Sequence, residues 1–396
     1  MASFQEMTFS ELLSDAEVFV DGDWVESKDQ DPNGDVRLIQ LADIGDGFYI
    51  DKSSRFLNSE TAKRLKCTYL KEGDILVARM PDPLGRACIF PKSEMPCVTV
   101  VDVCIIRPNP NKVDNRWLMH TINSAVMRQR INEYVTGTTR QRISRGNFSK
   151  LKISVPPLEQ QRRIASILDQ ADELRQKRQQ AIEKLDQLLQ ATFIDMFGDP
   201  VSNPKGWEKE KMDTLMTIVR GGSPRPIENF LGGTYPWIKI GDATKGDDLF
   251  ITKTKEAITE EGLHKTRLLP EGSVIFANCG VSLGFARILK IQGCIHDGWL
   301  AFQDIHEDKI HKLFLLKALN SITQYFRDTA PDGTQPNLNT AIMKNFELII
   351  PPMDLQLKFI AIVESIVNQK KILETSNIEF SNLFKSLQNQ AFNGTL

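Results

Sequence analysis

Long apolar runs are missing from this 396-residue chain. The longest, such as Phe346 to Pro352, are far shorter than the ~18 uncharged residues that a membrane-spanning helix needs. The first twenty residues contain four acidic side chains and lack a basic start followed by an apolar core, so no signal peptide is predicted. We therefore expect a cytoplasmic protein that does not enter a membrane.

Residues that bind metals are scarce and scattered. The six cysteines form no C-x-x-C pair, and His306 and His311 are five residues apart, which is off the spacing that puts two ligands on one helix face. Cys294 close to His296 and Asp297 could form a Cys/His site, but no separate pattern for a base and its orienting group supports it. The expectation is no metal site, and cysteines that are reduced and mostly buried.

Motifs for nucleotide chemistry are also missing. The chain has no G-x-x-x-x-G-K-[ST] loop and no G-x-G-x-x-G after a strand. It also lacks the Asn/Asp-Pro-Pro-aromatic element of adenine methyltransferases, because Val155 and Ile350 precede its two Pro-Pro pairs. The sequence thus predicts no catalytic residues and no cofactor bound by this chain.

An overall excess of one charge is absent, since the net charge is −2. The distribution is nevertheless uneven: residues 1–60 contain fourteen acids and four bases, whereas residues 128–163 contain nine bases and two acids. The basic stretch could bind the phosphates of a duplex or could simply be a solvated loop. Any nucleic-acid surface must be local.

The chain does contain an internal duplication. Leu70-Lys-Glu-Gly-Asp-Ile-Leu-Val-Ala-Arg79 recurs as Leu269-Pro-Glu-Gly-Ser-Val-Ile-Phe-Ala-Asn278, and further matched pieces follow in the same order. Their offset drifts only from 199 to 195 residues. This predicts two homologous halves, each a whole domain followed by a helix.

Each half changes character at a Pro-Pro pair. The preceding ~140 residues are rich in short β-branched runs, such as Gly73 to Val77, Gly272 to Phe276 and Val98 to Ile106, which predict strands. After the pairs, Leu158 to Phe197 and Met353 to Phe392 are rich in helix-forming residues. Each predicts one helix of ~60 Å, because an α-helix rises 1.5 Å per residue.

Apolar residues recur every three and four positions along both helices, which predicts a coiled coil. The alternative is that each amphipathic helix packs on its own domain. The fold class we expect is α+β, with two globular domains separated by two long antiparallel coiled-coil helices in a dumbbell with pseudo-two-fold symmetry. The expected seam consists of Ile164, Ile167, Leu174, Leu185, Leu188, Phe359, Ile362, Ile366, Leu373, Phe380, Leu383 and Leu387.

Matched positions of the two halves carry different polar side chains. Arg140 and Arg142 suit guanine, whereas the equivalent segment of the second half offers Gln335 and Asn337, which suit adenine, although that segment is also an ordinary turn. Trp237 could stack on a base or lie in the core. The candidate DNA-binding residues are Arg79, Arg86, Arg140, Arg142, Arg145, Arg220, Arg225, Lys239, Asn278, Ser282, Gln335 and Asn337.

This arrangement resembles the specificity subunit of type I restriction-modification systems over nearly the whole chain. The resemblance rests on the tandem halves, the helix starts Pro156-Pro-Leu-Glu-Gln-Gln161 and Pro351-Pro-Met-Asp-Leu-Gln356, and the Gly333 to Leu338 and Gln390 to Leu396 segments. Asp354-Leu355 departs from the Glu-Gln of the family, and residues 137–143 match Gly-Thr-Gln only loosely.

The resemblance implies target recognition domains at 1–157 and 200–352, and conserved helical regions at 158–199 and 353–396. Such a subunit binds a bipartite target in double-stranded DNA and docks two methyltransferase subunits as well as restriction (translocase) subunits. S-adenosylmethionine, ATP and Mg would belong to those partners, and this chain would not be an enzyme. Two other hypotheses stay open: a two-headed coiled-coil adaptor for proteins, and a self-contained DNA-modifying enzyme with an unrecognised site.

Overall fold

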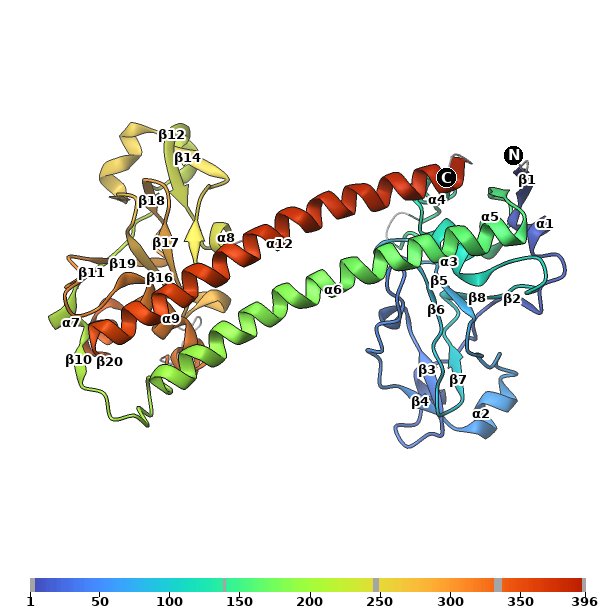
Figure 1. Cartoon of the computed structure of the whole chain (residues 1–396), viewed down its shortest axis with the longest axis horizontal. Helices are drawn as coiled ribbons and strands as arrows, with labels where there is room; N and C mark the ends of the chain where they lie inside the picture. Colours follow the sequence, from blue (N-terminus) through green and yellow to red (C-terminus); the bar gives the residue numbers. More distant parts are fainter. Residues whose placement is uncertain (1–3, 138–139, 245–248, 331–336, 394–396) are drawn as a thin grey trace. The chain divides into compact units, whose positions relative to one another are not determined.

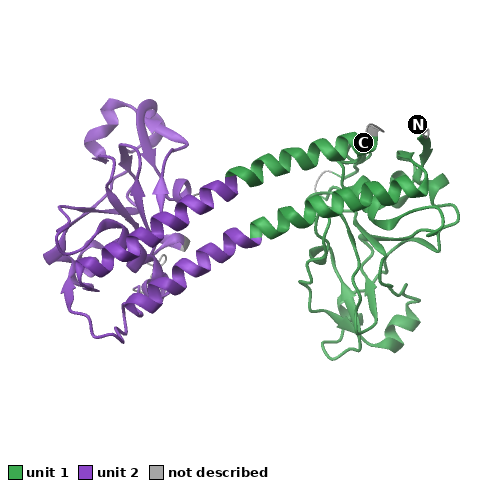
Figure 2. Ribbon diagram, viewed as in Figure 1, with its two compact units in different colours: residues 1–179, 375–396 green, residues 180–374 purple. Residues whose placement is uncertain are grey.

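The computed structural model describes residues 4–137, 140–244, 249–330 and 337–393. The chain divides into two compact units, residues 1–179 with 375–396 (unit 1) and residues 180–374 (unit 2) (Figure 2). Each unit contains one globular head and a segment of each of the two long helices (Figure 1). No helix in the described part of the chain is long and apolar enough to cross a membrane.

The head of unit 1 is built on two small sheets, with strand orders β2-β8-β5-β6 and β4-β3-β7, and on the pair β1-β9. Strands β3 and β7 run parallel, and the other pairs are antiparallel. Its elements are β1 (Gln5–Thr8), α1 (Phe9–Leu12), β2 (Val18–Asp21), β3 (Val36–Ile39), β4 (Phe56–Leu57), α2 (Ser59–Arg64), β5 (Ile75–Ala78), β6 (Ala87–Ile89), β7 (Cys97–Thr99), β8 (Val103–Arg107), α3 (Asn115–Ile122), α4 (Ala125–Glu133), α5 (Arg145–Phe148) and β9 (Lys152–Val155).

The head of unit 2 repeats this order, with sheets β11-β19-β16-β17-β13 and β14-β12-β18-β15 and the pair β10-β20. The short strand β13 is added at one edge, parallel to β17. The elements are β10 (Lys209–Lys211), α7 (Met212–Leu215), β11 (Thr217–Arg220), β12 (Leu231–Ile238), α8 (Ile240–Ala243), β13 (Phe250–Ile251), β14 (Glu256–Ile258), β15 (Arg267–Leu269), β16 (Val274–Ala277), β17 (Ala286–Leu289), β18 (Gly293–Ile295), β19 (Trp299–Gln303), α9 (Lys312–Ser321), α10 (Thr323–Thr329), α11 (Thr340–Asn345) and β20 (Glu347–Ile349).

The duplicated sequence runs end in the central strands β5 and β16, which are buried along their whole length. Alternate residues of a strand point to opposite faces. In β5, Ile75 and Val77 join the core beneath α3, while Leu76 and Ala78 join a second core on the other face. Strand β16 divides in the same way between two cores of unit 2. The predicted strand at Val98 to Ile106 is instead two strands, β7 and β8, separated by a turn.

Both long helices begin directly after their Pro-Pro pairs, as the sequence predicted: α6 spans Leu158–Phe197 and α12 spans Met353–Asn393. A buried glutamine explains the shared helix starts. The Gln161 side chain accepts from the Asp114 N–H (2.9 Å) and donates to the carbonyls of Lys112 (3.1 Å) and Pro156 (2.9 Å). This amide therefore fixes the helix to the loop before α3, because three backbone groups would otherwise lose partners.

Gln356 makes the same three bonds in unit 2. It accepts from the His311 N–H (2.9 Å) and donates to the carbonyls of Lys309 (2.9 Å) and Pro351 (2.8 Å). The departure at Asp354-Leu355 thus leaves the glutamine that secures the helix start in place.

The two helices pack against each other in opposite directions within each unit. In unit 1, the Arg178 guanidinium donates to Ser376 Oγ (2.8 Å) and lies 4.3 Å from the centre of the Phe380 ring. In unit 2, the ring centres of Phe193 and Phe359 are 5.5 Å apart. Higher numbers on α6 thus face lower numbers on α12, as expected for an antiparallel pair.

Five of the twelve expected seam positions have to be corrected by one residue. Ile164, Phe359 and Ile366 are buried, and Leu185, Leu373, Phe380 and Leu387 are partly buried at the interface. Leu174, Leu188, Ile362 and Leu383 are instead 36–53% exposed, and Ile167 is only partly buried. The residues that pack at those levels are the next ones along each helix, namely the buried Leu168, Leu189 and Val363 and the partly buried Arg175 and Phe384.

Candidate nucleic-acid interface

The loop after the central strand of each head is fastened to the segment before α5 or α11. In unit 1 the Ile143 N–H donates to the Arg79 carbonyl (3.1 Å), and in unit 2 the Leu338 N–H donates to the Asn278 carbonyl (2.8 Å). The two bonds are equivalent, so Arg79 corresponds to Asn278. The predicted loop of each head and the described residues just before α5 or α11 therefore meet at one place in each fold.

Arg79 and Arg86 lie inside unit 1, with exposed fractions of 7% and 8%. Arg86 donates to the carbonyls of Ile44 (2.6 Å), Leu41 (2.8 Å), Pro83 (3.1 Å) and Met80 (3.2 Å), and burial lowers its pKa. Both guanidinium groups hold loops together, so neither faces solvent as a DNA-reading side chain must.

The Arg79 side chain is also held by backbone carbonyls of its own head. It donates to the carbonyls of Val101 and Ile143 (3.4 Å to the latter), and its Nε lies 3.2 Å from the Asp21 carboxylate. The sequence shows arginines in these loops but does not show that loop carbonyls turn inward and need donors.

Arg140, Arg142 and Arg145 are exposed on unit 1. Within the described residues, the side chains of Arg140 and Arg142 take part in no ion pair, and the Arg142 backbone pairs with Thr136 (2.9 Å). Arg145 donates to the Phe19 carbonyl (3.1 Å) and lies 3.6 Å from Asp21. The side chains of Arg140 and Arg142 are therefore available to meet phosphates or base edges, whereas Arg145 is partly engaged within its own head.

Much of the remaining basic stretch is already paired. Arg128 contacts Asp46 (2.5 Å), Arg130 donates to the Lys152 carbonyl, and Lys152 itself lies 3.4 Å from Glu6. The acidic N-terminal region and the basic stretch thus partly neutralise each other within one head, and the exposed arginines remain as the available cations.

Two predicted residues of unit 2, Arg220 and Arg225, together with Ser223 converge on Asp297. Arg220 Nε donates to its carbonyl (2.8 Å), Arg225 lies 4.0 Å from its carboxylate, and Ser223 Oγ donates to that carboxylate (2.8 Å). Lys239 pairs with Glu256 (2.7 Å) nearby. The side chain of Arg225 is 76% exposed, so this cluster presents a cation to solvent.

His296 stands at the centre of this cluster, a position that the sequence did not reveal. Its Nδ1 accepts from the Gly298 N–H (2.9 Å), and its ring lies 5.7 Å from the buried Trp237 ring. Burial lowers the pKa of His296, with Asp297 opposing and three nearby cations reinforcing the shift. The lowered pKa favours the neutral imidazole at pH 7, and its Nδ1 also lies 2.9 Å from the Asp297 carboxylate.

Asn278 is fully buried beside Asn337, and its Nδ2 lies 3.4 Å from Asn337 Oδ1. The Asn278 Oδ1 has no hydrogen-bond partner among the described residues. Ser282 is partly exposed at the end of the turn Gly280–Ser282. Gln335 lies outside the described residues.

The heads carry different charges at equivalent points. Gly22 and Gly221 both pack against a carbonyl oxygen, 2.3 Å from the position that a Cβ would occupy, which aligns Asp21 with Arg220. Gln40 and Lys239 each precede a short turn capped by an aspartate. An acid and an amide in unit 1 thus replace two cations in unit 2.

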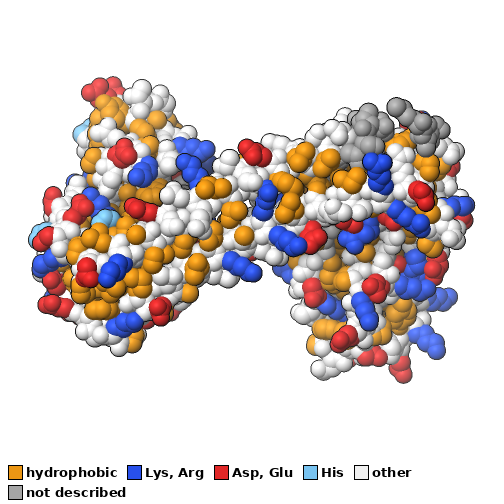
Figure 3. All heavy atoms as spheres, viewed as in Figure 1, with side chains coloured by type: hydrophobic (Ala, Val, Ile, Leu, Met, Phe, Trp, Pro, Cys, Tyr) orange, Lys and Arg blue, Asp and Glu red, His pale blue; other side chains and the backbone are white. Residues whose placement is uncertain are grey.

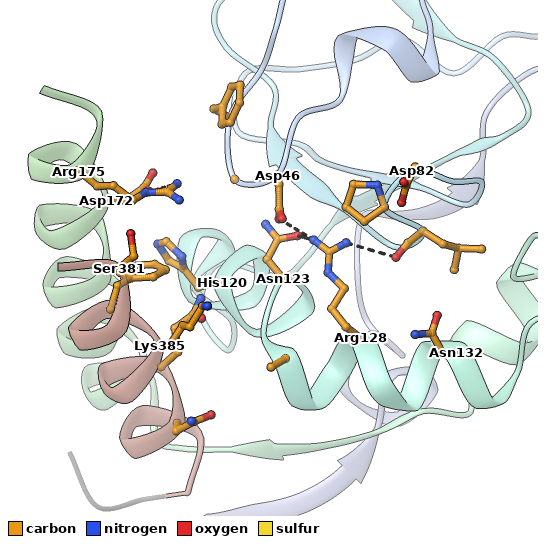
Figure 4. A pocket seen from close by; sticks show the side chains of 18 of the residues that line it. Asp46, Asp82, His120, Asn123, Arg128, Asn132, Asp172, Arg175, Ser381 and Lys385 are labelled. Atoms are coloured by element: carbon orange, nitrogen blue, oxygen red, sulfur yellow. Dashed lines mark hydrogen bonds and ion pairs between the residues drawn. The ribbon is translucent and has the colours of Figure 1, made fainter. Parts of the chain in front are cut away.

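A polar cleft of about 760 Å³ separates the head of unit 1 from its helices (Figure 4). Arg128, Asn123 and Asp46 line the head side, and Arg175 and Lys385 line the helix side.

At the back of the cleft, His120 Nε2 contacts Asp169 (2.8 Å), which also pairs with Arg116 (2.7 Å). These two contacts join α3 to α6, so the head has a defined orientation on the helices within this unit.

The possible Cys/His site does not have the geometry of a nucleophile. Cys294 is buried with Trp237 and Ile258, and burial raises its pKa to about 11. At neutral pH it is a thiol, which is the unreactive form. Within the described residues, no three His, Cys, Asp or Glu side chains are grouped so that they could hold a metal ion.

Comparison with known proteins decides the family. The family model described as "Type I restriction modification DNA specificity domain" matches residues 10–184 and 204–380. The chain belongs to this family. The two matches coincide with the two duplicated halves.

Curated relatives agree over most of the chain. The MjaIX type I restriction enzyme specificity subunit of Methanocaldococcus jannaschii is 24% identical, with 87% of this chain and 84% of the relative covered. The MjaVIII specificity subunit of the same organism is 22% identical, with coverages of 100% and 96%.

Solved structures show the same fold. A structure described as "Structural basis underlying complex assembly and conformational transition of the type I R-M system" has a TM-score of 0.65 at 18% identity, with 100% of this chain and 98% of that chain covered. The type I restriction-modification S subunit from M. genitalium has a TM-score of 0.56 at 16% identity, with coverages of 99% and 96%. The main hypothesis from the sequence, a DNA sequence-specificity subunit, is confirmed by these relatives, whereas the adaptor and enzyme alternatives receive no support.

Proposed function

We propose that this chain selects the DNA target of a type I restriction-modification complex, with each head binding one half of a bipartite sequence. The observation that carries the proposal is the exchange of polar groups at equivalent points of one fold. Unit 2 presents Arg220, Lys239 and Asn337 where unit 1 has Asp21, Gln40 and Arg142. Identical scaffolds with different readers suit two different half-sites.

The division into target recognition domains at 1–157 and 200–352 and helical regions at 158–199 and 353–396 is part of this proposal. Double-stranded DNA would be bound by the exposed arginines of unit 1 and the Asp297-centred cluster of unit 2. S-adenosylmethionine, ATP and Mg would serve two methyltransferase subunits and the restriction subunits, which would carry out the catalysis. The complex would act in the cytoplasm, where the DNA is.

The helices offer a surface for the methyltransferase subunits. Ile167, Leu174 and Leu188 on α6 flank the seam on one side, and Ile362 and Leu383 occupy the same heptad position on α12. In an antiparallel coiled coil, residues at this position lie on one side of both helices. We call these five residues the apolar flank; hydrophobic side chains are visible on the exposed helix surface (Figure 3).

The opposite flank faces the head. Asp172, Ser381 and Gln388 line the cleft beside the head of unit 1, so that side of the helix pair is already covered there. Exposed apolar side chains on a helix pair are typical of a docking surface for further helices. The duplication supplies the flank in both units, which fits two methyltransferase subunits per chain.

The experiment that tests the function is mapping of adenine methylation in the host with Arg220→Ala in place of the native residue. We expect a split motif with a fixed spacer for the native chain, and relaxed or lost specificity in one half-site only for the variant, since one good bidentate contact is worth ~1–3 kcal/mol of discrimination. Lys211→Ala, which removes an exposed cation from strand β10 of the same head, is the charge-matched control. A continuous motif, or no change on deletion of the gene, would contradict the proposal.

A further inference from the structure

Trp24 is the most exposed of the five tryptophans, with 69% of its surface accessible. Trp117 and Trp299 are fully buried, Trp237 is 3% exposed, and Trp207 is half-buried with its indole N–H bonded to the Phe197 carbonyl (2.9 Å). An indole ring exposed to water does not gain the stabilisation that burial of its apolar surface normally gives. Such a ring on a protein surface is a candidate contact residue.

The backbone that presents Trp24 is firmly held. Just before it, the Gly22 N–H donates to the Val103 carbonyl (2.8 Å) and the Asp23 N–H donates to the Thr99 carbonyl (2.7 Å). The Asp23 carboxylate accepts from the Thr68 N–H (3.0 Å). A side chain projected from a fixed backbone can form a contact without first paying for ordering of the loop.

Trp24 stands between two hollows on unit 1. One, of about 610 Å³, is also lined by Met80, Arg140 and Arg142. The other, of about 670 Å³, is lined by Gln40 and Arg55 among others. Cationic and amide side chains that suit phosphates and base edges therefore lie on both sides of one exposed aromatic ring, whose indole N–H donates to Glu26 (3.3 Å).

We propose that Trp24 stacks on a base, at an opened base step, in the half-site that unit 1 binds. This rests on the DNA-binding function proposed above and adds a contact of a different kind. Aromatic rings bind bases through their π-faces, and apolar side chains act as wedges between base steps in several DNA-binding folds. The contact would be specific to unit 1, because the alignment of Gly22 with Gly221 places Ser223, bonded to Asp297, at the equivalent position.

Two substitutions separate stacking from a merely structural role. Trp24→Ala should weaken binding of the complex of this chain with its methyltransferase to a duplex carrying the mapped motif by roughly 10- to 100-fold, the order expected for loss of one base–aromatic stack. Trp24→Phe, which keeps an aromatic face, should recover most of that loss. Tyr69→Ala, which removes a 41% exposed aromatic ring of the same head that lines neither hollow, is the matched control and should bind like the native chain.

Fluorescence places the contact directly. The difference in tryptophan emission between the native full chain and Trp24→Phe is the contribution of Trp24. Acrylamide should quench this contribution less when the motif duplex is bound. Equal affinities of native and Trp24→Ala chains would overturn the proposal, as would shielding of Trp24 by the methyltransferase subunit without DNA, which would make it a protein contact. If the native complex showed no preference for the motif duplex, the proposed function itself would fail, whatever Trp24 did.

Discussion

At the scale of single residues, burial decides which polar side chains can read DNA. Arg79 and Arg86 occur in the same kind of loop as Arg140 and Arg142. The first two, however, are buried and donate hydrogen bonds to backbone carbonyls inside the head. The sequence could predict the loops, because the duplication marks them. It could not predict which arginines turn inward, because that depends on carbonyls supplied by segments distant along the chain.

Asp23, next to Trp24, makes the stability of unit 1 depend on pH. Burial raises its pKa to about 6, against the ordinary 3.8, although it accepts a hydrogen bond from Thr68. A carboxyl group whose pKa is higher in the folded state binds its proton more tightly there, so folding is favoured below pH 3.8 and loses that contribution as the pH rises to about 6.

Asp23→Asn should abolish this dependence. Between pH 4 and pH 7 the native chain should lose on the order of 1 kcal/mol more unfolding free energy than the variant, a figure reduced for partial exposure. Urea unfolding of both chains at the two pH values measures the difference. Parallel changes in the two chains would show that Asp23 does not titrate in this window.

At the scale of elements, the helix ends were predictable and the phase of the seam was not. Pro-Pro pairs and helix-forming residues fix where α6 and α12 begin. The phase was ambiguous because two adjacent apolar stripes run along α6, one containing Leu168 and Leu189 and the other Leu174 and Leu188. Periodicity cannot tell which stripe packs in the pair and which stays exposed for another protein.

Two neighbouring leucines turn this distinction into a prediction. Leu189→Glu would bury an unpaired charge in the core of unit 2, since Leu189 is 5% exposed, and should lower the unfolding free energy by about 3 kcal/mol or more. Leu188→Glu changes a 53% exposed residue and should cost less than about 0.5 kcal/mol. Urea denaturation distinguishes the two.

The same pair tests the docking surface. Leu188→Glu combined with Leu383→Glu should prevent co-purification with the methyltransferase subunit, because both substitutions place charge on the apolar flank. Gln187→Glu combined with Asn382→Asp, each at an exposed position one residue away, adds the same two charges outside the flank and should leave assembly intact. If the double variant assembled normally, the apolar flank would not be the docking site for the methyltransferase subunit.

At the scale of the whole molecule, the sequence duplication accounts for two heads of one fold, and divergence within the fold accounts for two specificities. The helices link the heads in sequence, and we propose that their length sets the spacer between the half-sites. Gln161 and Gln356 fix the first turns of α6 and α12 to the heads. Residues that lengthen the helix pair must therefore be inserted in the middle of the helices. An insertion must therefore be made in both helices at the same level of the antiparallel pair.

Lys370 contacts Asp186 (2.6 Å), which places the two insertion points: seven residues after Lys184 and seven after Lys370. A full heptad preserves the seam and adds ~10 Å at 1.5 Å per residue, close to the length of three base pairs at ~3.4 Å each. Methylation mapping of the variant should then show the same two half-sites with a spacer about three base pairs longer. Insertion in α6 alone breaks the register of the pair and should abolish methylation. An unchanged spacer in the doubly lengthened chain would mean that the partner subunits, rather than these helices, measure the distance.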